Sequence, residues 1–146
     1  MSTHSIAALL AARGAWLKGQ GSSPDETIER RGLTRLIADH YALFEQVRDR
    51  IFRSTEQFVR HAEIIPQTLD PGGHEILAAL LSHGLIRREP EGAEICELKG
   101  KKYLSGGWLE ELAWLAAREA GADEVIHGQN IVWKVQSYSG ENEIDL

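Results

Sequence analysis

The sequence of 146 residues has little of several residue types, and each scarcity excludes a class of protein. Cys96 is the only cysteine, which excludes an intramolecular disulfide framework or a cysteine-rich zinc site and is typical of the reducing cytoplasm. No run approaches the roughly 18 apolar residues of a membrane span, so we expect no membrane partner. Residues 6–12 are apolar, but no Lys or Arg precedes them, so a secretory signal is not expected.

The pattern most typical of a chemical site lies in the last forty or so residues. A helix is predicted from Trp108 to Gly121, after the break at Ser105-Gly106-Gly107, and Glu110 borders its apolar arc, where a carboxylate can face a crevice. The helical spacing is set by one series of apolar residues: Leu109, Leu112, Ala113, Ala116 and Ala120. The apolar arc that Glu110 borders is expected to contain Trp108, Leu112, Leu115 and Ala116.

Two strands are predicted after this helix. Residues 131–138 are rich in β-branched and aromatic side chains, Ser139-Gly140 is a hairpin signal, and residues 141–146 begin the second strand. Because side chains two apart on a strand share a face, Glu143 and Asp145 are expected to point together. The result is a helix and a hairpin with an acid on each outer element.

The run Tyr-Leu-Ser-Gly-Gly-Trp-Leu-Glu-Glu at residues 103–111, followed by Asn-Glu-Ile-Asp at residues 142–145, resembles a known family. It is similar to the start of the nuclease domain in CRISPR-associated CARF-domain endonucleases of the PD-(D/E)xK, restriction-endonuclease-like superfamily. Those type III antiviral-defence proteins carry, in order, a Rossmann-like CARF domain that senses cyclic oligoadenylate, a winged-helix-like linker domain and a metal-dependent nuclease domain. The resemblance covers roughly residues 65–146.

The resemblance implies that Glu110 and Asp145 are the catalytic and metal-binding acids, holding Mg²⁺ or Mn²⁺. In phosphodiester hydrolysis a divalent cation stabilises charge on the phosphate oxygens and lowers the pKa of a bound water. Mg²⁺ needs only one or two carboxylates besides water and phosphate, so we expect these two carboxylates to converge. The alternative is that Glu110 and Glu111 are present only because the helix dipole favours acids in the first turn, and that Glu141, Glu143 and Asp145 form a solvated acidic tail.

The family pattern also predicts what this chain lacks. In the family, the strand with the Glu-x-Lys half of the motif follows soon after the residue that corresponds to Asp145, whereas this sequence ends at Leu146. The sequence also shows no glycine-rich start typical of a CARF domain. Residues 106–146 set only Arg118 and Lys134 against eight acids, whereas a nuclease needs basic residues for phosphate contacts. We therefore expect a truncated nuclease segment with weak metal binding and no activity as an isolated chain.

The first half of the sequence is predicted to be helical. Residues 3–18 are interpreted as a short helix that ends at the Gly- and Ser-rich run before Pro24. Residues 25–62 carry apolar side chains at spacings of three and four, with arginines and acids on the other faces. The segment is read as one helix or two, with Gly32 as a weak point.

The middle of the chain resembles a winged helix. Asp70-Pro71 is read as an N-cap followed by a first helical residue, Gly84 as the helix end, and residues 85–89 and 94–98 as a hairpin. We expect its core to contain Ile76, Leu80, Leu85 and Leu98. The residues expected to contact nucleic acid, DNA or RNA, lie on or just beyond the wing: Arg87, Arg88, Lys99, Lys101 and Lys102.

The helix before the wing offers no Arg or Lys to read bases, which favours a linker or dimerisation role, with a homodimer as the expected assembly. The expected fold class is α+β and mostly helical. Its parts are an N-terminal helix and linker (1–24), a long helical segment (25–64), a winged-helix-like domain (65–104) and an incomplete nuclease start (105–146). The alternative function is a winged-helix DNA-binding or protein-interaction module without enzymatic activity.

Overall fold

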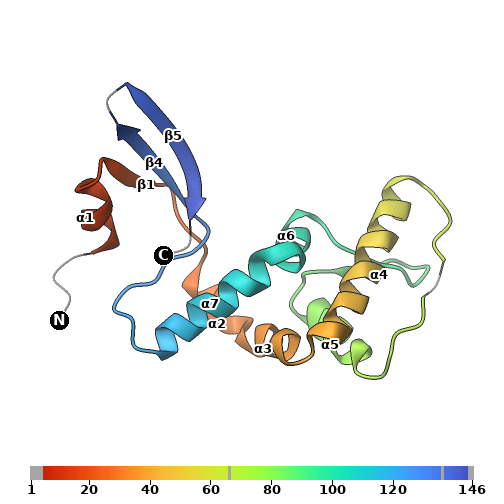
Figure 1. The fold of residues 1–146 in the computed structure, drawn as a ribbon. Coiled ribbons are helices and arrows are strands. Elements are labelled where there is room, and N and C mark those ends of the chain that lie inside the picture. The colour runs from red at the N-terminus through yellow and green to blue at the C-terminus, as the bar shows by residue number, and fades with distance from the viewer. Residues whose placement is uncertain (1–4, 66, 136, 145–146) are drawn as a thin grey trace. The chain divides into compact units, whose positions relative to one another are not determined.

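The computed structural model describes residues 5–65, 67–135 and 137–144 of the chain. It divides into two compact units: unit 1 comprises residues 1–29 and 110–146, and unit 2 comprises residues 30–109. Helices predominate and both sheets are small and antiparallel, so the predicted α+β class is confirmed (Figure 1). Within the described ranges, no helix combines the length and hydrophobicity that a transmembrane span requires.

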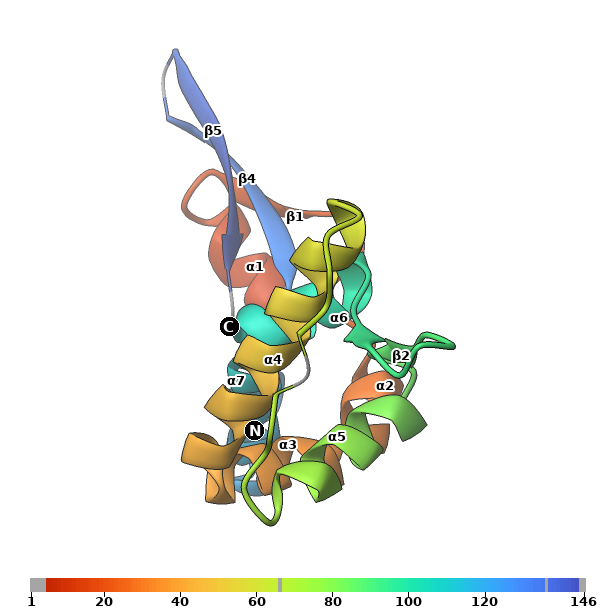
Figure 2. The same cartoon turned by 90° about the vertical axis from the view of Figure 1, so that its right-hand side faces the viewer.

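Unit 2 is built on three helices, α3 (Arg31–Asp39), α4 (Tyr41–Val59) and α5 (Gly73–Ser82). Helix α5 lies against α3 and α4 (Figure 2). Their apolar residues recur at helical spacing, so each helix buries one face and leaves its charged residues in water. The fully buried side chains of this core are Ile37, Phe44, Val47, Ile51, Ile76, Leu80 and Leu104.

A short hairpin follows α5. Strands β2 (Arg87–Arg88) and β3 (Glu94–Ile95) pair antiparallel, and Leu85 before them is buried. The next helix, α6 (Leu98–Lys102), passes so close to this region that a Cβ on Gly100 would overlap the carbonyl oxygen of Leu85. Only glycine permits this approach of helix and backbone.

Helix α6 runs through a π-helical turn, η1 (Tyr103–Gly107), into α7 (Trp108–Glu119). The Tyr103 hydroxyl lies 2.9 Å from the Thr34 hydroxyl, and both residues are buried. The Trp108 ring packs edge-on against Phe44, with 5.5 Å between centroids. These contacts fix the glycine-rich turn to the core of unit 2.

Unit 1 joins two segments that are distant in sequence. Strand β1 (Ala15–Lys18) pairs antiparallel with β4 (Gln129–Val135), which pairs with β5 (Tyr138–Ile144), giving the order β1-β4-β5. The same segments supply α1 (Ile6–Ala11) and α2 (Pro24–Glu29). Thr27 on α2 is fully buried, and its hydroxyl lies 3.1 Å from His127 Nε2.

The prediction of one helix over residues 3–18 is wrong. Helix α1 ends at Ala11, Gly14 takes a left-handed φ of 74°, and residues 15–18 form β1. The Gly14 carbonyl accepts a hydrogen bond of 2.9 Å from Lys134 N, so the chain is already engaged with β4 there. Pairing of β1 with β4, more than 110 residues away in the sequence, outweighs the local helical pattern. A short sequence window cannot detect such a distant pairing.

Two predictions about the middle segment are also wrong. Asp70 does not cap a helix, because α5 begins at Gly73 after a left-handed Gly72, and the Asp70 carboxylate instead accepts a hydrogen bond from Gln46 Nε2 at 2.9 Å. Leu98 is 83% exposed, whereas Ile76, Leu80 and Leu85 are buried as expected. Leu98 begins α6 rather than ending the hairpin, so it leaves the core.

The helix predicted after Gly107 is confirmed as α7, but only part of its expected apolar face is buried. Trp108 and Leu115 of the predicted arc are buried, and Leu112 is half-buried. Leu109 is 55% exposed and Ala113, Ala116 and Ala120 are exposed, whereas the buried face consists of Trp108, Glu111, Trp114 and Leu115. The hairpin is also confirmed, but Ser139 and Gly140 lie within β5, paired with β4, rather than in the turn. Gly140 instead pairs with Trp133, whose indole covers it and leaves no space for a side chain.

Candidate functional site

Glu110, the first of the two expected metal ligands, lies in the first turn of α7 and is half-buried. Asp145, the second, lies outside the described residues, so its predicted convergence with Glu110 stays a prediction. Strand β5 is described up to Ile144, and Glu110 and β5 belong to the same unit. The neighbouring Glu111 is only 4% exposed, a burial that its position in an acidic pair did not indicate.

The outer strand of the sheet is held by side chains as well as by its backbone ladder. Trp133 Nε1 donates to Asn142 Oδ1 at 3.0 Å, so the Asn of the Asn-Glu-Ile-Asp run is fixed beside the indole. Glu141 accepts from Lys18 Nζ at 2.8 Å and from Asn130 Nδ2 at 3.0 Å. Glu141 therefore has a structural partner, and it is not part of an uncommitted acidic tail.

The donor chemistry of Glu110 and Asp145 fits a hard divalent cation, because Mg²⁺ and Mn²⁺ prefer carboxylate and water oxygens. Within the described residues, no group of three or more His, Cys, Asp or Glu side chains could hold a metal ion. The described part of the chain thus supplies one carboxylate of the expected pair and no other ligand cluster.

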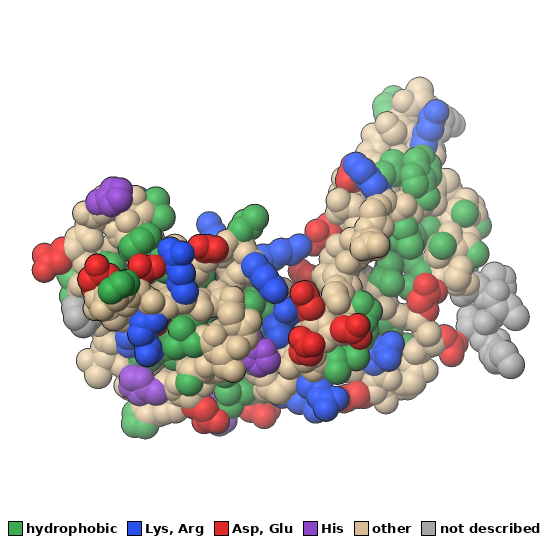
Figure 3. Space-filling model, turned by 180° about the vertical axis from the view of Figure 1, so that it is seen from behind, with side chains coloured by type: hydrophobic (Ala, Val, Ile, Leu, Met, Phe, Trp, Pro, Cys, Tyr) green, Lys and Arg blue, Asp and Glu red, His purple; other side chains and the backbone are tan. Residues whose placement is uncertain are grey.

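The five basic residues expected to contact nucleic acid fall into two groups. Arg87 Nε and Nη1 each lie 2.9 Å from a carboxylate, of Glu89 and Glu97 respectively, and Arg88 lies 3.4 Å from Glu94. The three lysines, in contrast, occupy the five-residue helix α6 and are exposed: Lys99, Lys101 and Lys102. On the face shown in Figure 3, basic and acidic side chains are interspersed rather than separated into one basic surface.

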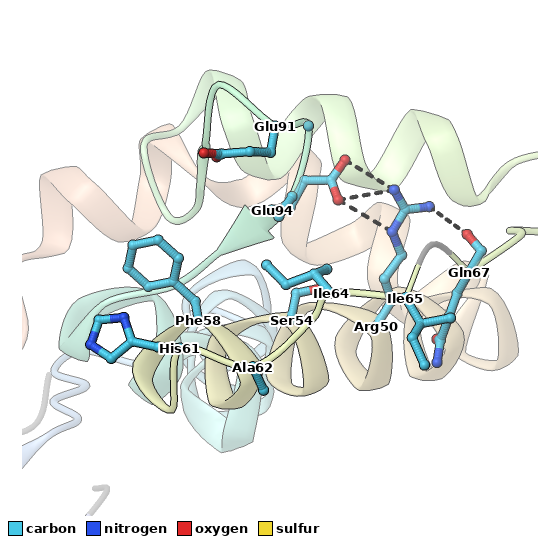
Figure 4. A pocket seen from close by; sticks show the side chains of 12 residues that line it. Arg50, Ser54, Phe58, His61, Ala62, Ile64, Ile65, Gln67, Glu91 and Glu94 are labelled. Atoms are coloured by element: carbon cyan, nitrogen blue, oxygen red, sulfur yellow. Dashed lines mark hydrogen bonds and ion pairs between the residues drawn. The ribbon is translucent and has the colours of Figure 1, made fainter.

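Unit 2 also contains a pocket of about 470 Å³ between the C-terminal part of α4, residues 61–67 and the turn before β3. One wall is an ion pair, in which Arg50 donates from Nη2 and Nε to the Glu94 carboxylate at 2.9 to 3.2 Å and from Nη1 to the Gln67 carbonyl at 3.0 Å (Figure 4). Glu94 is 3% exposed. The pair therefore links α4 to the hairpin inside the fold.

Sequence reasoning missed this pocket. Arg50 belongs to a series of arginines that alternates with acids along the helix, which is the ordinary pattern of a solvated face. Its partner Glu94 is 44 residues away in the sequence and lies among the charged residues of the β2-β3 hairpin. No local signal distinguishes these two residues from Arg48 or Glu91, because only the packing of the hairpin on α4 buries them.

Comparison with solved structures finds two proteins of the same fold. Protein VC1899 from Vibrio cholerae matches with a TM-score of 0.63 and 16% identity, over 96% of this chain and 39% of that protein. Can2 from Sulfobacillus thermosulfidooxidans, solved in complex with cyclic tetra-adenylate, matches with a TM-score of 0.54 and 16% identity, over 97% of this chain and 38% of Can2. The chain thus spans about two-fifths of the length of each neighbour.

These likenesses establish a shared fold. No family model matches the sequence, and no curated protein is similar to it in sequence. The assignments of the middle segment as a winged helix and of the last segment as restriction-endonuclease-like therefore stay predictions.

Proposed function

We propose that this chain forms the linker and the beginning of the nuclease domain of a CRISPR-associated, type III, cyclic-oligoadenylate-responsive nuclease. The observation that carries the proposal is the agreement of two independent comparisons. The runs at residues 103–111 and 142–145 resemble this family in sequence. The fold of the chain is similar to that of Can2, which was solved with cyclic tetra-adenylate bound. The match to two-fifths of each neighbour supports a function within a longer assembly.

In this proposal Glu110 and Asp145 hold Mg²⁺ or Mn²⁺, which when bound supplies Lewis-acid stabilisation of phosphate charge and a more acidic water. Glu110 is suited to the role because its carboxylate is half-buried and lies at the start of a helix anchored through Trp108 and Trp114. The Trp114 indole donates to the Val125 carbonyl at 3.0 Å, which fixes the rotation of α7 in unit 1.

The lysines of α6 are the proposed contacts to the nucleic-acid backbone, DNA or RNA. All three residues are exposed and lie on one short helix. Arg87 and Arg88 are also exposed in part, and each lies beside a carboxylate. A cytoplasmic location and a homodimeric assembly belong to the same proposal.

Metal binding by the full chain tests the proposal directly. Mn²⁺ titrated into the protein and followed by electron paramagnetic resonance should show weak saturable binding that Glu110→Gln and Asp145→Asn each reduce. Glu143→Gln is the matched control, because it removes the same charge from the same strand and should leave Mn²⁺ binding unchanged. Binding that survives both ligand substitutions, or that is equally sensitive to Glu143→Gln, would count against the metal site and favour a binding module without enzymatic activity.

A further inference from the structure

The pocket beside Arg50 and Glu94 has the features of a small-ligand site. Its volume of about 470 Å³ lies within the range of ligand pockets, roughly 300 to 1,000 Å³. Aromatic and aliphatic side chains line part of it, and polar groups converge on it from three segments of unit 2. The residues that matter below are Ser54, Phe58, His61, Gln67 and Glu91.

Charges of both signs lie at or near the pocket, because Arg88 lies 3.4 Å from Glu94 and the Arg87 guanidinium lies 5.9 Å from the centroid of the Phe58 ring. The group that a ligand could pair with is Glu91. The Arg50 guanidinium is held by both oxygens of the buried Glu94 and by the Gln67 carbonyl, so its positive charge is offset and its donors are engaged. Glu91, at the hairpin turn, is exposed, and no ion pair engages it in the part of the chain that the structure describes. Its side chain extends along the pocket opposite Phe58 and His61 (Figure 4). An anionic ligand would meet this carboxylate, whereas a cation would be attracted to it.

Ser54 places a hydroxyl in the wall of the pocket. This residue is 7% exposed, and it lines the pocket. Among the residues that the structure describes, no atom makes a hydrogen bond to the Ser54 hydroxyl, even though the neighbouring Thr55 hydroxyl donates to the Ile51 carbonyl at 2.7 Å. The Ser54 oxygen is not among the described buried side-chain atoms that lack a partner, so it meets solvent in the pocket. A ligand donor there would replace a hydrogen bond to water.

His61 adds a backbone feature at the same place. It follows α4 in the left-handed region, with φ of 55°, and it is the only described non-glycine residue with positive φ. Glycine is the usual residue at such a helix end, because a Cβ is disfavoured there. A histidine that accepts this conformation while lining the pocket is consistent with a ligand contact.

We propose that this pocket binds an organic cation, an ammonium or guanidinium group on an apolar stem. Glu91 supplies the counter-charge, the Ser54 hydroxyl accepts a hydrogen bond from the bound cation, and Phe58 and Ile64 contact the stem. The site contains neither Glu110 nor any residue of unit 1, so it does not depend on the proposed nuclease function.

The test uses the full chain, labelled with ¹⁵N, and a pair of probes of equal shape. Titration with n-butylguanidinium should give saturable amide shifts around Gly92, Ala93 and Ala62, whereas the uncharged n-butylurea should bind much more weakly. Two further probes separate the sources of the cation: agmatine represents a free metabolite, and N-acetyl-arginine-N-methylamide represents a side chain of a partner protein. Binding of either one supports the site and identifies its source.

Variants decide whether the named groups are responsible. Glu91→Gln should weaken n-butylguanidinium binding about fivefold, as expected for a partly exposed ion pair, and Ser54→Ala should also weaken it about fivefold through one hydrogen bond. The matched control is Glu63→Gln, an equal charge change on an exposed residue outside the pocket lining. Equal binding of the urea, equal effects of Glu63→Gln and Glu91→Gln, or shifts confined to other regions would overturn the proposal. Because Glu91 is exposed, its substitution tests the site even if Ser54→Ala alters folding.

Discussion

Arg50 on α4 and Glu94 on β3 form a bidentate ion pair, with Nη2 2.9 Å from Oε2. The Glu94 side chain is 4% exposed and the Arg50 side chain 19%, so the pair is largely removed from water. Taking two charges out of water is costly, and the pair is tolerated because every Glu94 oxygen has an arginine donor. The hairpin therefore depends on α4 for the partner of its buried carboxylate.

We predict that Arg50→Ala lowers the free energy of unfolding by about 3 kcal/mol, because it leaves the Glu94 charge buried without its main partner. The paired change Arg50→Met with Glu94→Leu should recover most of this loss, since it removes both charges. Urea unfolding followed by circular dichroism measures both effects.

The control is Arg60→Ala, which breaks an ion pair with Glu56 whose side chains are 72% and 58% exposed. Such an exposed pair contributes about 0 to 1 kcal/mol. Equal losses for Arg50→Ala and Arg60→Ala would show that the buried pair has no special role in stability.

Gly100→Ala should be strongly destabilising, by about 3 kcal/mol or more, because the added methyl group meets the Leu85 carbonyl oxygen, which belongs to rigid backbone. Gly32→Ala in α3 is the matched control, since nothing lies within 4 Å of its Cβ position and alanine favours a helix. In thermal unfolding, the melting temperature of Gly100→Ala should fall and that of Gly32→Ala should rise relative to the unchanged protein. A stable Gly100→Ala protein would mean that α6 shifts freely on the hairpin.

The sequence predicted those elements whose signals are local. Helix α7 and the β4-β5 hairpin follow from the glycine run before Trp108 and from β-branched residues near Ile131. The buried face of α7 was predicted only in part. Trp108 and Leu115 are buried as expected, but alanines that fit the same helical period are exposed and Trp114 is buried instead. Period alone cannot choose between two apolar stripes when one of them consists of alanines.

Features that depend on distant contacts were not predictable. The strand at residues 15–18 exists because Trp16 pairs with Val132, and Thr27 is buried because His127 lies beside it. The buried acid Glu94 has no signal of its own, since its arginine partner lies on another element. The candidate metal site was indicated only by resemblance to a family, because two acids 35 positions apart have no period or spacing in common.

Deletion of residues 1–19 should destabilise unit 1 selectively. It removes β1 and exposes the edge of β4, while the contacts within residues 30–109 remain. Hydrogen exchange read by mass spectrometry should show faster exchange in residues 129–144 and unchanged protection in α4 and α5. Equal loss of protection in both units would show that they unfold as one cooperative body.

Replacing Lys99, Lys101 and Lys102 together by Gln should weaken binding of a single-stranded oligonucleotide and reduce its salt dependence. Each phosphate contact contributes about 0.7 to the slope of log K against log salt, so the loss should approach 2. Arg87→Gln with Arg88→Gln should change the slope less, because carboxylates already offset those charges. Fluorescence anisotropy at several salt concentrations measures the slopes, and the opposite ranking would shift the proposed contact from α6 to the hairpin.

The 146-residue chain is predicted not to cleave nucleic acid by itself. In the nuclease family that the sequence resembles, the site acts as a unit with a Glu-x-Lys strand, and loss of members of such a unit lowers the rate by orders of magnitude. Residues 106–146 also carry eight acids against two basic residues, which repel a phosphate backbone from the position where Glu110 would act.

Single-turnover assays with single- and double-stranded DNA and RNA in Mn²⁺ should therefore show no cleavage above that of the Glu110→Ala protein. Both variants, Glu110→Ala and Asp145→Ala, are needed, because a contaminating nuclease would be insensitive to them. Cleavage that both substitutions abolish would show that two carboxylates are sufficient in this fold, and that the reaction obtains its base from a residue other than the expected lysine.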